Sequence, residues 1–492
     1  MRSDDDDDPG LPIPFGPVSN GEYDPPPLTA LERVAQRRAV AECDANARRL
    51  GVSRRQFLLS VCGAATTLLA IQACSDDKSK GKAGGKFNLP TTSALDENAA
   101  RSRLAGDEVI FDVQTHLLDY DTIDPAHRLG LGLAAAFPQR NCSDASEPRD
   151  CFDARHLLEL LFLQSDTTMA ILSAIPVVGD RSPLSPAIMA ETRRVTEALC
   201  NDDRLLLHGQ VAPSAGRPQA SLDAMDKVLA THPVVAWKVY THAGGPGWWL
   251  DDHEPDAPQV GEAFIRKVVE TKVPRIAVHK GFGSIGGSQA GYASPVDIGP
   301  AAKTHTDVDF IVYHSGYESG GNEGPYTASA DPQGVDRLIA SLEKSGIGPN
   351  QNVYAELGST WFSVMRNPNQ AAHVLGKLLK HVGEDRVVWG TDTLWYGSPQ
   401  SQIQALRAFE ITPEFQERYG YPALTPAIKN KIFGGNSMRL YGVKPIETKC
   451  EFTRAELEQV RKERPGGNAA PGPKTAREAA AARARDWAWQ IS

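Results

Sequence analysis

The stretch Val109-Ile110-Phe111-Asp112-Val113-Gln114-Thr115-His116 is the starting point for interpreting this chain. It begins as an apolar run, and polar side chains then alternate with other residues toward its end. Because successive side chains of a strand point to opposite faces, Asp112, Gln114 and His116 share one face. A buried polar group costs free energy unless it is paired or bound to a metal. The stretch therefore predicts a buried strand that ends in a functional site.

Seven similar runs follow, separated by segments with helical periodicity. The eight predicted strands are residues 109–115, 168–178, 205–212, 234–241, 275–279, 310–314, 353–357 and 387–390. The predicted helices between them are residues 154–164, 187–199, 220–230, 261–271, 335–344 and 369–381. Strands that alternate with helices indicate parallel βαβ units, and eight units predict an α/β fold of the (β/α)8 TIM barrel type with long loops. The alternative, a doubly wound open sheet, would need a glycine-rich phosphate turn of the GxGxxG form, which the sequence lacks.

Bulk composition is that of a globular protein. The chain has 492 residues, of which 41% are hydrophobic and 23% charged, and its net charge is -9. No basic patch with interleaved aromatic residues occurs, which argues against nucleic acid as a partner. We predict a barrel over residues 108–445 and a helical C-terminal tail over residues 446–492, the latter with a helix over 453–463 and tryptophans at 487 and 489.

The first hundred residues resemble an export signal with flanking segments rather than a folded domain. Residues 1–52 are predicted to be a disordered extension, and residues 53–74 contain Ser53-Arg54-Arg55-Gln56-Phe57-Leu58 before a short apolar stretch. This is the twin-arginine export pattern. It predicts delivery to the periplasm or to the outer face of the cell membrane. Residues 75–107 are predicted to be a linker.

Cysteines raise two further questions about the exported form. Ile71-Gln72-Ala73-Cys74 weakly matches a lipobox, so anchoring to the membrane by a lipidated Cys74 or by an uncleaved signal segment stays open beside ordinary cleavage. Cys142 and Cys151 lie nine residues apart in a predicted loop. In an oxidising compartment they would form a disulfide, and otherwise they are two free thiols.

Polar residues recur where the predicted strands end. Side chains at the carboxyl ends of barrel strands converge on one mouth. His116, His279, His314 and Asp392 each lie at such an end. Imidazole and carboxylate groups together suit Zn²⁺, with Mn²⁺ or Fe²⁺ as alternatives, so we predict a site for one divalent ion.

These motifs resemble the amidohydrolase superfamily, and within it the amidohydrolase-related branch that includes enzymes like aminocarboxymuconate-semialdehyde decarboxylase. Gly390-Thr391-Asp392 is similar to the family's eighth-strand motif, and Gly435-Asn436-Ser437-Met438-Arg439-Leu440 is similar to its closing helix. The resemblance spans about residues 108–443. It implies a TIM barrel with a metal-dependent site.

The resemblance also implies roles for single residues. The metal ligands would be His116, His279 and Asp392. His314 would be either a further ligand or, together with Asp392, the catalytic group that takes a proton from water. Gln114 departs from the family pattern, which has His there. It would either ligate the metal through its amide oxygen or hydrogen-bond to substrate. Candidate substrate contacts are Lys238, Tyr240, Lys280 and Trp395.

Three functions remain open at this level. The first is a metal-dependent hydrolase in which activated water attacks a carbonyl of a small organic substrate. The second is a non-oxidative decarboxylase of an unsaturated or aromatic acid. The third is a non-catalytic envelope protein on a degenerate barrel, which Gln114 favours and the retained histidines oppose. The expected partner is a small molecule, and a homo-oligomer stays open.

Overall fold

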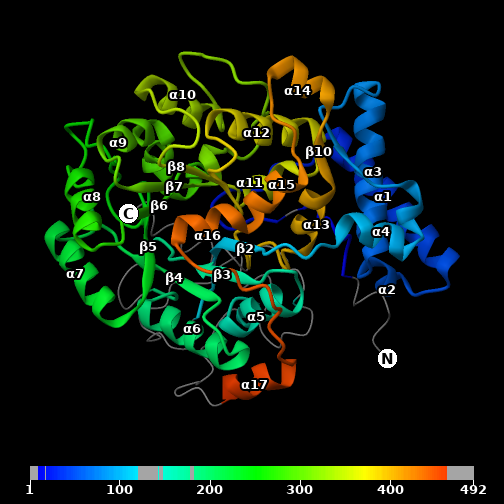
Figure 1. Cartoon of the computed structure of the whole chain (residues 1–492), viewed down its shortest axis with the longest axis horizontal. Helices are drawn as coiled ribbons and strands as arrows, with labels where there is room; N and C mark the ends of the chain where they lie inside the picture. The colour runs from blue at the N-terminus through cyan, green and yellow to red at the C-terminus, as the bar shows by residue number, and fades with distance from the viewer. Residues whose placement is uncertain (1–8, 17, 120–141, 143–147, 178–181, 463–492) are drawn as a thin grey trace.

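Eight parallel strands form the centre of the molecule in the computed structural model (Figure 1), which describes residues 9–16, 18–119, 142, 148–177 and 182–462. Their order in the sheet follows the sequence. The strands are β2 (Phe111–Thr115), β3 (Met169–Leu172), β4 (Leu205–Gln210), β5 (Val234–Tyr240), β6 (Arg275–His279), β7 (Asp309–Tyr313), β8 (Val353–Glu356) and β9 (Val387–Val388). All eight coincide with predicted strands, although the ends differ by a few residues.

The sheet closes on itself through the first and last strands. The amide of Val113 donates to the carbonyl of Trp389 at 3.0 Å, and the amide of Asp392 donates to the carbonyl of Gln114 at 2.9 Å. A parallel bridge joins Thr115 to Thr393. The predicted TIM barrel is thus confirmed, and the open doubly wound sheet is wrong.

Helices surround the barrel where the sequence predicts them. They are α5 (Ala154–Leu158) with the π-helical turn η6 (Glu159–Leu163), α6 (Pro186–Cys200), α7 (Pro218–Thr231), α8 (Gly261–Glu270), α10 (Asp336–Ser345) and α12 (Pro368–His381). Local chemistry sets their ends. For α6, the Ser185 side chain accepts a hydrogen bond from the Ile188 amide, Pro186 opens the helix, and Asn201 closes it in the left-handed conformation.

Shorter elements complete the barrel and its tail. They are η5 (Pro148–Cys151), η8 (Gly283–Ala293), η9 (Pro295–Asp297), α9 (Ile298–Thr304), η10 (His314–Gly316), α11 (Thr360–Val364), α13 (Gln400–Ala408), β10 (Phe409–Ile411), α14 (Pro413–Tyr419), α15 (Pro426–Asn430), η11 (Lys431–Gly435), α16 (Asn436–Tyr441) and α17 (Arg454–Lys462). The tail helix predicted over 453–463 corresponds to α17. The predicted C-terminal helix with Trp487 and Trp489 lies outside the described residues.

The N-terminal hundred residues differ from the expectation of an extension and a linker. They form α1 (Ala30–Leu50), α2 (Arg54–Leu58), α3 (Val61–Ser79), β1 (Gly85–Phe87), η2 (Thr91–Ala94) and α4 (Glu97–Leu104). A capping box between Thr29 and Glu32 starts α1, and Gly51 ends it. These helices form a layer on one side of the barrel (Figure 1), in which α3 packs on α1 and α4 and β1 pairs with β10. The expected disorder is wrong from Ala30 to Leu50, because the buried face of α1 packs against the apolar α3.

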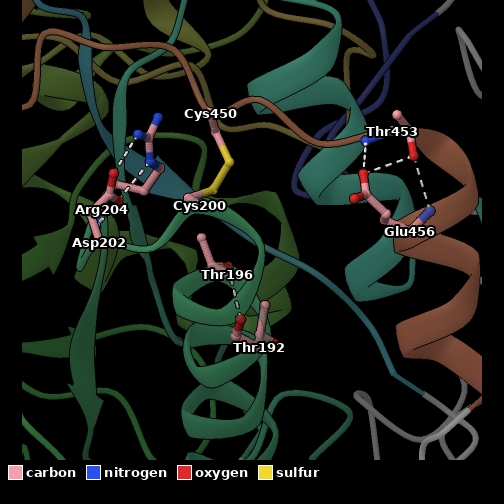
Figure 2. The surroundings of a disulfide bond; sticks show 8 residues. All are labelled: Thr192, Thr196, Cys200, Asp202, Arg204, Cys450, Thr453 and Glu456. Atoms are coloured by element: carbon pink, nitrogen blue, oxygen red, sulfur yellow. Dashed lines mark hydrogen bonds and ion pairs between the residues drawn. A yellow bond between two sulfur atoms is a disulfide. The ribbon is translucent and has the colours of Figure 1, made fainter.

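Two disulfides join loop and tail segments. Cys142 pairs with Cys151, which is the pairing that the sequence left open beside two free thiols. Cys200, the last residue of α6, pairs with Cys450 in the tail across 250 residues (Figure 2), a link that the sequence did not indicate. Cys43, Cys62 and Cys74 are buried free thiols.

Within the described ranges, no helix is long and apolar enough to cross a membrane.

Candidate metal centre at the barrel mouth

The four residues predicted to form the site meet at the carboxyl end of the barrel. His116 follows β2, His279 ends β6, His314 follows β7, and Asp392 lies just beyond β9. All four side chains are buried. The rings of His279 and His314 are 4.6 Å apart, and Nε2 of His116 lies 3.3 Å from Oδ1 of Asp392. The strand ends therefore bring the predicted groups together, as the barrel geometry requires.

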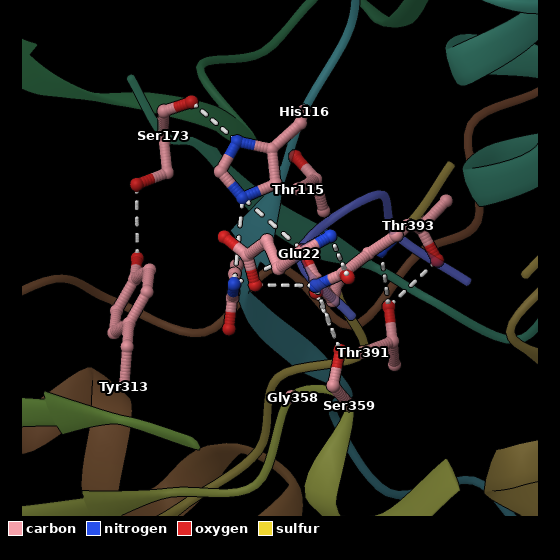
Figure 3. A network of polar contacts seen from close by, with 12 residues as sticks. Glu22, Thr115, His116, Ser173, Tyr313, Gly358, Ser359, Thr391 and Thr393 are labelled. Atoms are coloured by element: carbon pink, nitrogen blue, oxygen red, sulfur yellow. Dashed lines mark hydrogen bonds and ion pairs between the residues drawn. The ribbon is translucent and has the colours of Figure 1, made fainter. Parts of the chain in front are cut away.

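Each imidazole uses one ring nitrogen to contact a backbone carbonyl. Nδ1 of His116 lies 2.8 Å from the carbonyl of Ser173, as the upper part of Figure 3 shows. Nε2 of His279 contacts Gly281 at 2.9 Å, and Nδ1 of His314 contacts Gly358 at 2.7 Å. Since a carbonyl only accepts, these nitrogens carry the hydrogen, and in the neutral form of a ring the other nitrogen presents a lone pair. This tautomer choice is typical of metal-binding histidines.

Asp392 is held by several donors. Its Oδ1 accepts from Nε2 of Gln114 at 3.0 Å, and its Oδ2 accepts from the hydroxyl of Ser359 at 2.5 Å. Burial alone would raise the pKa of this carboxyl, but His116, His314 and Ser359 lower it to about 2. The carboxylate is thus kept ionised inside the mouth.

Gln114 acts as a donor in this arrangement. Its amide nitrogen reaches Asp392 and lies 3.4 Å from Nε2 of His116, while its amide oxygen is buried without a hydrogen-bond partner among the described residues. Both alternatives from the sequence, metal ligation by the oxygen and a hydrogen bond to substrate, stay predictions.

Left-handed backbone occurs at several positions of the mouth. His314, Ser359 and Asp392 have φ angles of 63°, 56° and 59°. Residues other than glycine adopt this region at a cost in free energy, and such strain collects at functional sites. Here it turns the chain sharply where the strands end.

Three of the predicted substrate contacts flank the cluster. Nζ of Lys238 is buried without a hydrogen-bond partner in the described part of the chain and lies 4.1 Å and 4.0 Å from the ring centroids of Tyr240 and Tyr313. Burial lowers the pKa of this amine to about 7, although Glu22, Glu356 and Asp392 oppose the shift. Tyr240 stacks on His279 at 4.9 Å, and Trp395 stacks on His116 at 6.2 Å.

Lys280 is paired with groups of the protein itself, whereas its sequence position suggested a contact with substrate. Its ammonium group donates to Asp297 at 2.8 Å and to the carbonyl of Tyr292 at 3.0 Å, and both charged side chains are fully buried. This buried pair links the end of β6 to η9. Contact with substrate stays an untested prediction for Lys280.

An N-terminal segment that the sequence did not connect with the site enters the mouth. The Asn20 amide donates to Oδ2 of Asp392 at 2.7 Å. Oε1 of Glu22 lies 3.3 Å from Nδ1 of His279, and Oε2 lies 3.5 Å from Nε2 of His314. Figure 3 shows Glu22 inside the polar network of the strand ends. Glu22, His279 and His314 each offer one ligand atom within 4.8 Å of the others, so the donor set fits a cation.

Burial controls the charge of these groups. It lowers the pKa of His279 well below its ordinary value and that of His314 to about 4, and it raises the pKa of Glu22, as does the nearby Asp392. The imidazoles are therefore neutral at pH 7, which is the form that ligates metals.

Glu356 is a second carboxylate that the sequence reasoning missed. It ends β8, is fully buried, and accepts from the amides of His314 at 3.0 Å and Gly358 at 2.5 Å. The rule that selected Asp392 also selects Glu356, because both are charged residues at the end of an apolar strand. No such rule points to Glu22, whose position in the sequence is remote from every strand.

A cavity of about 620 Å³ lies beside this N-terminal segment rather than over the histidines. Its wall includes Val18, Tyr23, Tyr317 and Arg366. Tyr23 also hydrogen-bonds Tyr396 at 3.2 Å, and Tyr396 in turn contacts Ser359 at 2.6 Å. The segment thus separates the cavity from the polar cluster.

Comparison with known proteins gives one family match. The family model described as amidohydrolase matches residues 111–443, which is more than half of the chain. No curated protein matches the chain.

Several solved structures are similar to this chain at low identity. One is 5-carboxyvanillate decarboxylase from Novosphingobium aromaticivorans complexed with manganese and 4-hydroxy-3-methoxy-5-nitrobenzoic acid, with 14% identity over 68% of this chain and 96% of that chain, and a TM-score of 0.40. The 2,6-dihydroxybenzoate decarboxylase from Rhizobium has 15% identity over 68% and 99%, with a TM-score of 0.38. An uncharacterised TIM-barrel protein from Bordetella bronchiseptica has 14% identity over 68% and 98%, with a TM-score of 0.41.

Proposed function

Because the chain belongs to the amidohydrolase family, we propose that it is a hydrolase that binds one divalent cation at the barrel mouth. One observation carries the proposal: the imidazoles of His116, His279 and His314 each donate to a backbone carbonyl and turn the opposite nitrogen toward a carboxylate. These residues and Asp392 would hold the cation. Zn²⁺ is our first choice, with Mn²⁺ or Fe²⁺ as alternatives.

The bound cation would lower the pKa of water and polarise a substrate carbonyl. The chain's own contribution is to place proton acceptors beside that position. Asp392 is the candidate, because Ser359 fixes its orientation, and His314 takes this role only where its Nε2 is not a ligand of the cation. Tyr240 and Trp395 would confine a small planar substrate.

The environment of Lys238 favours a substrate that carries a carboxylate. Lys238 is a buried amine without a hydrogen-bond partner in the described residues, so the carboxylate of a substrate would supply the missing acceptor. The same feature makes non-oxidative decarboxylation of an unsaturated or aromatic acid our second candidate. A non-catalytic envelope protein is the third alternative that the experiments must address.

Metal analysis of the purified protein tests whether the mouth binds a cation. We expect about one equivalent of metal in the wild type and a strong loss in His279→Ala. His305→Ala is the matched control, because His305 contacts Glu262 outside the mouth. A wild type that takes up no divalent metal would refute the proposal and favour the non-catalytic alternative.

A substrate panel separates the two reactions. Esters, lactones and amides of carboxylated compounds should release acid if the chain is a hydrolase, whereas aromatic acids should release CO₂ if it is a decarboxylase. Lys238→Met should raise KM for the carboxylated members of the panel more than for uncharged analogues. Equal effects on both would contradict the assignment of Lys238.

Export by the twin-arginine route, to the periplasm or the outer membrane face, is part of the proposal. The two disulfides support it, since such bonds persist in oxidising compartments. Lipidation of Cys74, a homo-oligomer and a partner set limited to small molecules without nucleic acid stay predictions from the sequence.

A further inference from the structure

Residues 19–23 form a tight, buried turn that carries Glu22 into the barrel mouth. The Ser19 hydroxyl accepts from the Gly21 amide at 2.9 Å, and the Asn20 side-chain oxygen accepts from the Glu22 amide at 2.9 Å. Tyr23 stacks on Phe282 at 4.9 Å. Only 12% of the Glu22 side chain is exposed. The carboxylate is therefore placed by local structure and is not a chance contact of a loose tail.

The imidazole of His279 supplies no hydrogen to its contact with Glu22. Nε2 of His279 donates to Gly281, so in the neutral ring Nδ1 holds only a lone pair. This lone pair faces Oε1 of Glu22 at 3.3 Å. Two acceptors at that distance repel each other unless a proton or a cation lies between them.

His314 repeats the arrangement with the other oxygen. Its Nδ1 donates to Gly358, and its Nε2 lone pair faces Oε2 of Glu22 at 3.5 Å. A single proton on the carboxyl group could satisfy one of the two contacts and would leave the other unpaired. A cation placed between the three groups would satisfy both.

The separations of these atoms also fit shared coordination. Ligands about 2.0–2.2 Å from one ion at a tetrahedral angle are about 3.4 Å apart. The two contacts of Glu22 with the histidines, 3.3 and 3.5 Å, lie on either side of that value. Gln114 cannot bring negative charge to the mouth, whereas Glu22 can.

We propose that Glu22 is a ligand of the cation, together with His279 and His314, so that a segment outside the barrel completes its metal site. This inference rests on the proposed function, because it assumes that the mouth binds a divalent ion. It adds a ligand that the barrel strands do not contain.

Asn20 is a positioning residue for this ligand. Its side-chain nitrogen donates to Oε2 of Glu22 and to Oδ2 of Asp392. One amide thus orients two carboxylates, one from the N-terminal segment and one from the barrel, and it relieves the repulsion between them.

Metal affinity of the full-length protein tests the inference without any substrate. Chelator-treated protein is titrated with Co²⁺, followed by its visible absorption, and with Zn²⁺ by calorimetry. Glu22→Gln should weaken binding at least about 100-fold, the upper end of what loss of a supporting partner costs, and should change the Co²⁺ spectrum. Asp24→Asn is the matched control, because it removes an exposed carboxylate from the same segment and should leave affinity within about twofold.

The outcomes separate this inference from the proposed function. If the wild type binds and Glu22→Gln binds equally well or more tightly, Glu22 merely occupies the mouth, and only the inference is overturned. If the wild type binds neither ion, the proposed function fails. Thermal unfolding of the metal-free variants checks their folding. Should Glu22→Gln not fold, Glu22→Asp answers the question, because its shorter carboxylate should weaken binding and alter the spectrum.

Discussion

The Asn20 side chain connects the N-terminal segment to the barrel through two acidic groups. It donates to Asp392 at 2.7 Å and to Glu22, so two carboxyl groups face this one side-chain amide. Replacement of a donor by an acceptor of the same shape converts two hydrogen bonds into two repulsions.

We therefore expect Asn20→Asp to detach the segment from the mouth in the metal-free protein. Amide hydrogen exchange over residues 18–23 should accelerate strongly, whereas Asn20→Ala, which removes the donor without adding charge, should have a smaller effect. Equal protection in Asn20→Asp and the wild type would show that this contact does not hold the segment.

Gly390 is constrained by the buried carboxylate of Glu356. A Cβ atom at this position would collide with Oε1 of Glu356, a group already fixed by two backbone amides. Gly390→Ala should lower the free energy of unfolding by about 1–3 kcal/mol, as overpacking does. Gly291→Ala is the control, because a Cβ there meets nothing within 4 Å. Chemical denaturation of both variants measures the difference, and an unchanged Gly390→Ala midpoint would contradict the close packing.

At the scale of elements, strand ends were predictable and the N-terminal layer was not. His279 and Asp392 follow apolar runs with clear periodicity, so barrel geometry alone places them at one mouth. Glu22 contacts His279 from a turn, and no periodic pattern in the sequence predicts this turn. Its proposed role depends on tertiary contacts with residues hundreds of positions away, and a single sequence does not encode such contacts in any local signal.

The sequence and the structure suggest different roles for the apolar helix α3. In the sequence, α3 follows paired arginines as the apolar part of an export signal does. In the structure, α3 is buried against α1 and α4, and Arg54 of the preceding helix α2 forms an ion pair with Asp44. Removal of α3 as a signal would expose the barrel side that it covers and would also remove Glu22.

Of the three fates that the sequence leaves open for the signal segment, we expect the uncleaved one, because cleavage or lipidation at Cys74 would remove Glu22. Intact-mass analysis of protein recovered from the cell envelope should give a chain that still contains residues 9–79. A mature chain that begins near Cys74 would show ordinary cleavage or lipidation there, and it would exclude Glu22 from the working site. Replacement of Arg54 and Arg55 by lysine tests the export route itself.

For the molecule as a whole, Asp166 connects the barrel to the tail. Burial alone would raise the pKa of this carboxyl, but hydrogen bonds from Gln400, Lys449 and Arg407 lower it to about 2. A folded-state pKa below the unfolded value of about 3.9 means that the stabilisation is present above pH 4 and is lost as pH falls toward 2. Asp166→Asn should therefore lower stability at pH 7 and flatten its decline in acid. Unfolding midpoints measured between pH 2 and 7 check this, and parallel curves for variant and wild type would contradict it.

The disulfide between Cys200 and Cys450 closes a much longer loop than the one between Cys142 and Cys151, with separations of 250 and 9 residues. Longer loops lose more chain entropy on closure, so Cys200→Ser should destabilise the protein by about 2–5 kcal/mol, more than Cys142→Ser does. Denaturation under oxidising and reducing conditions measures this. The difference should vanish in reductant, and equal midpoints under oxidising conditions would refute the ranking.

The position of Glu22 in the sequence also affects when its contacts can form during synthesis of the protein. The Asn20–Asp392 contact joins residues 372 apart, so Asn20 is synthesised well before its partner Asp392. At about 5–20 residues per second, that interval is on the order of 20–75 s. During this time the contact between Asn20 and Asp392 cannot form, because the last strand of the barrel is still missing. If Glu22 is a ligand as proposed, we expect metal uptake only after translation has delivered the final strand.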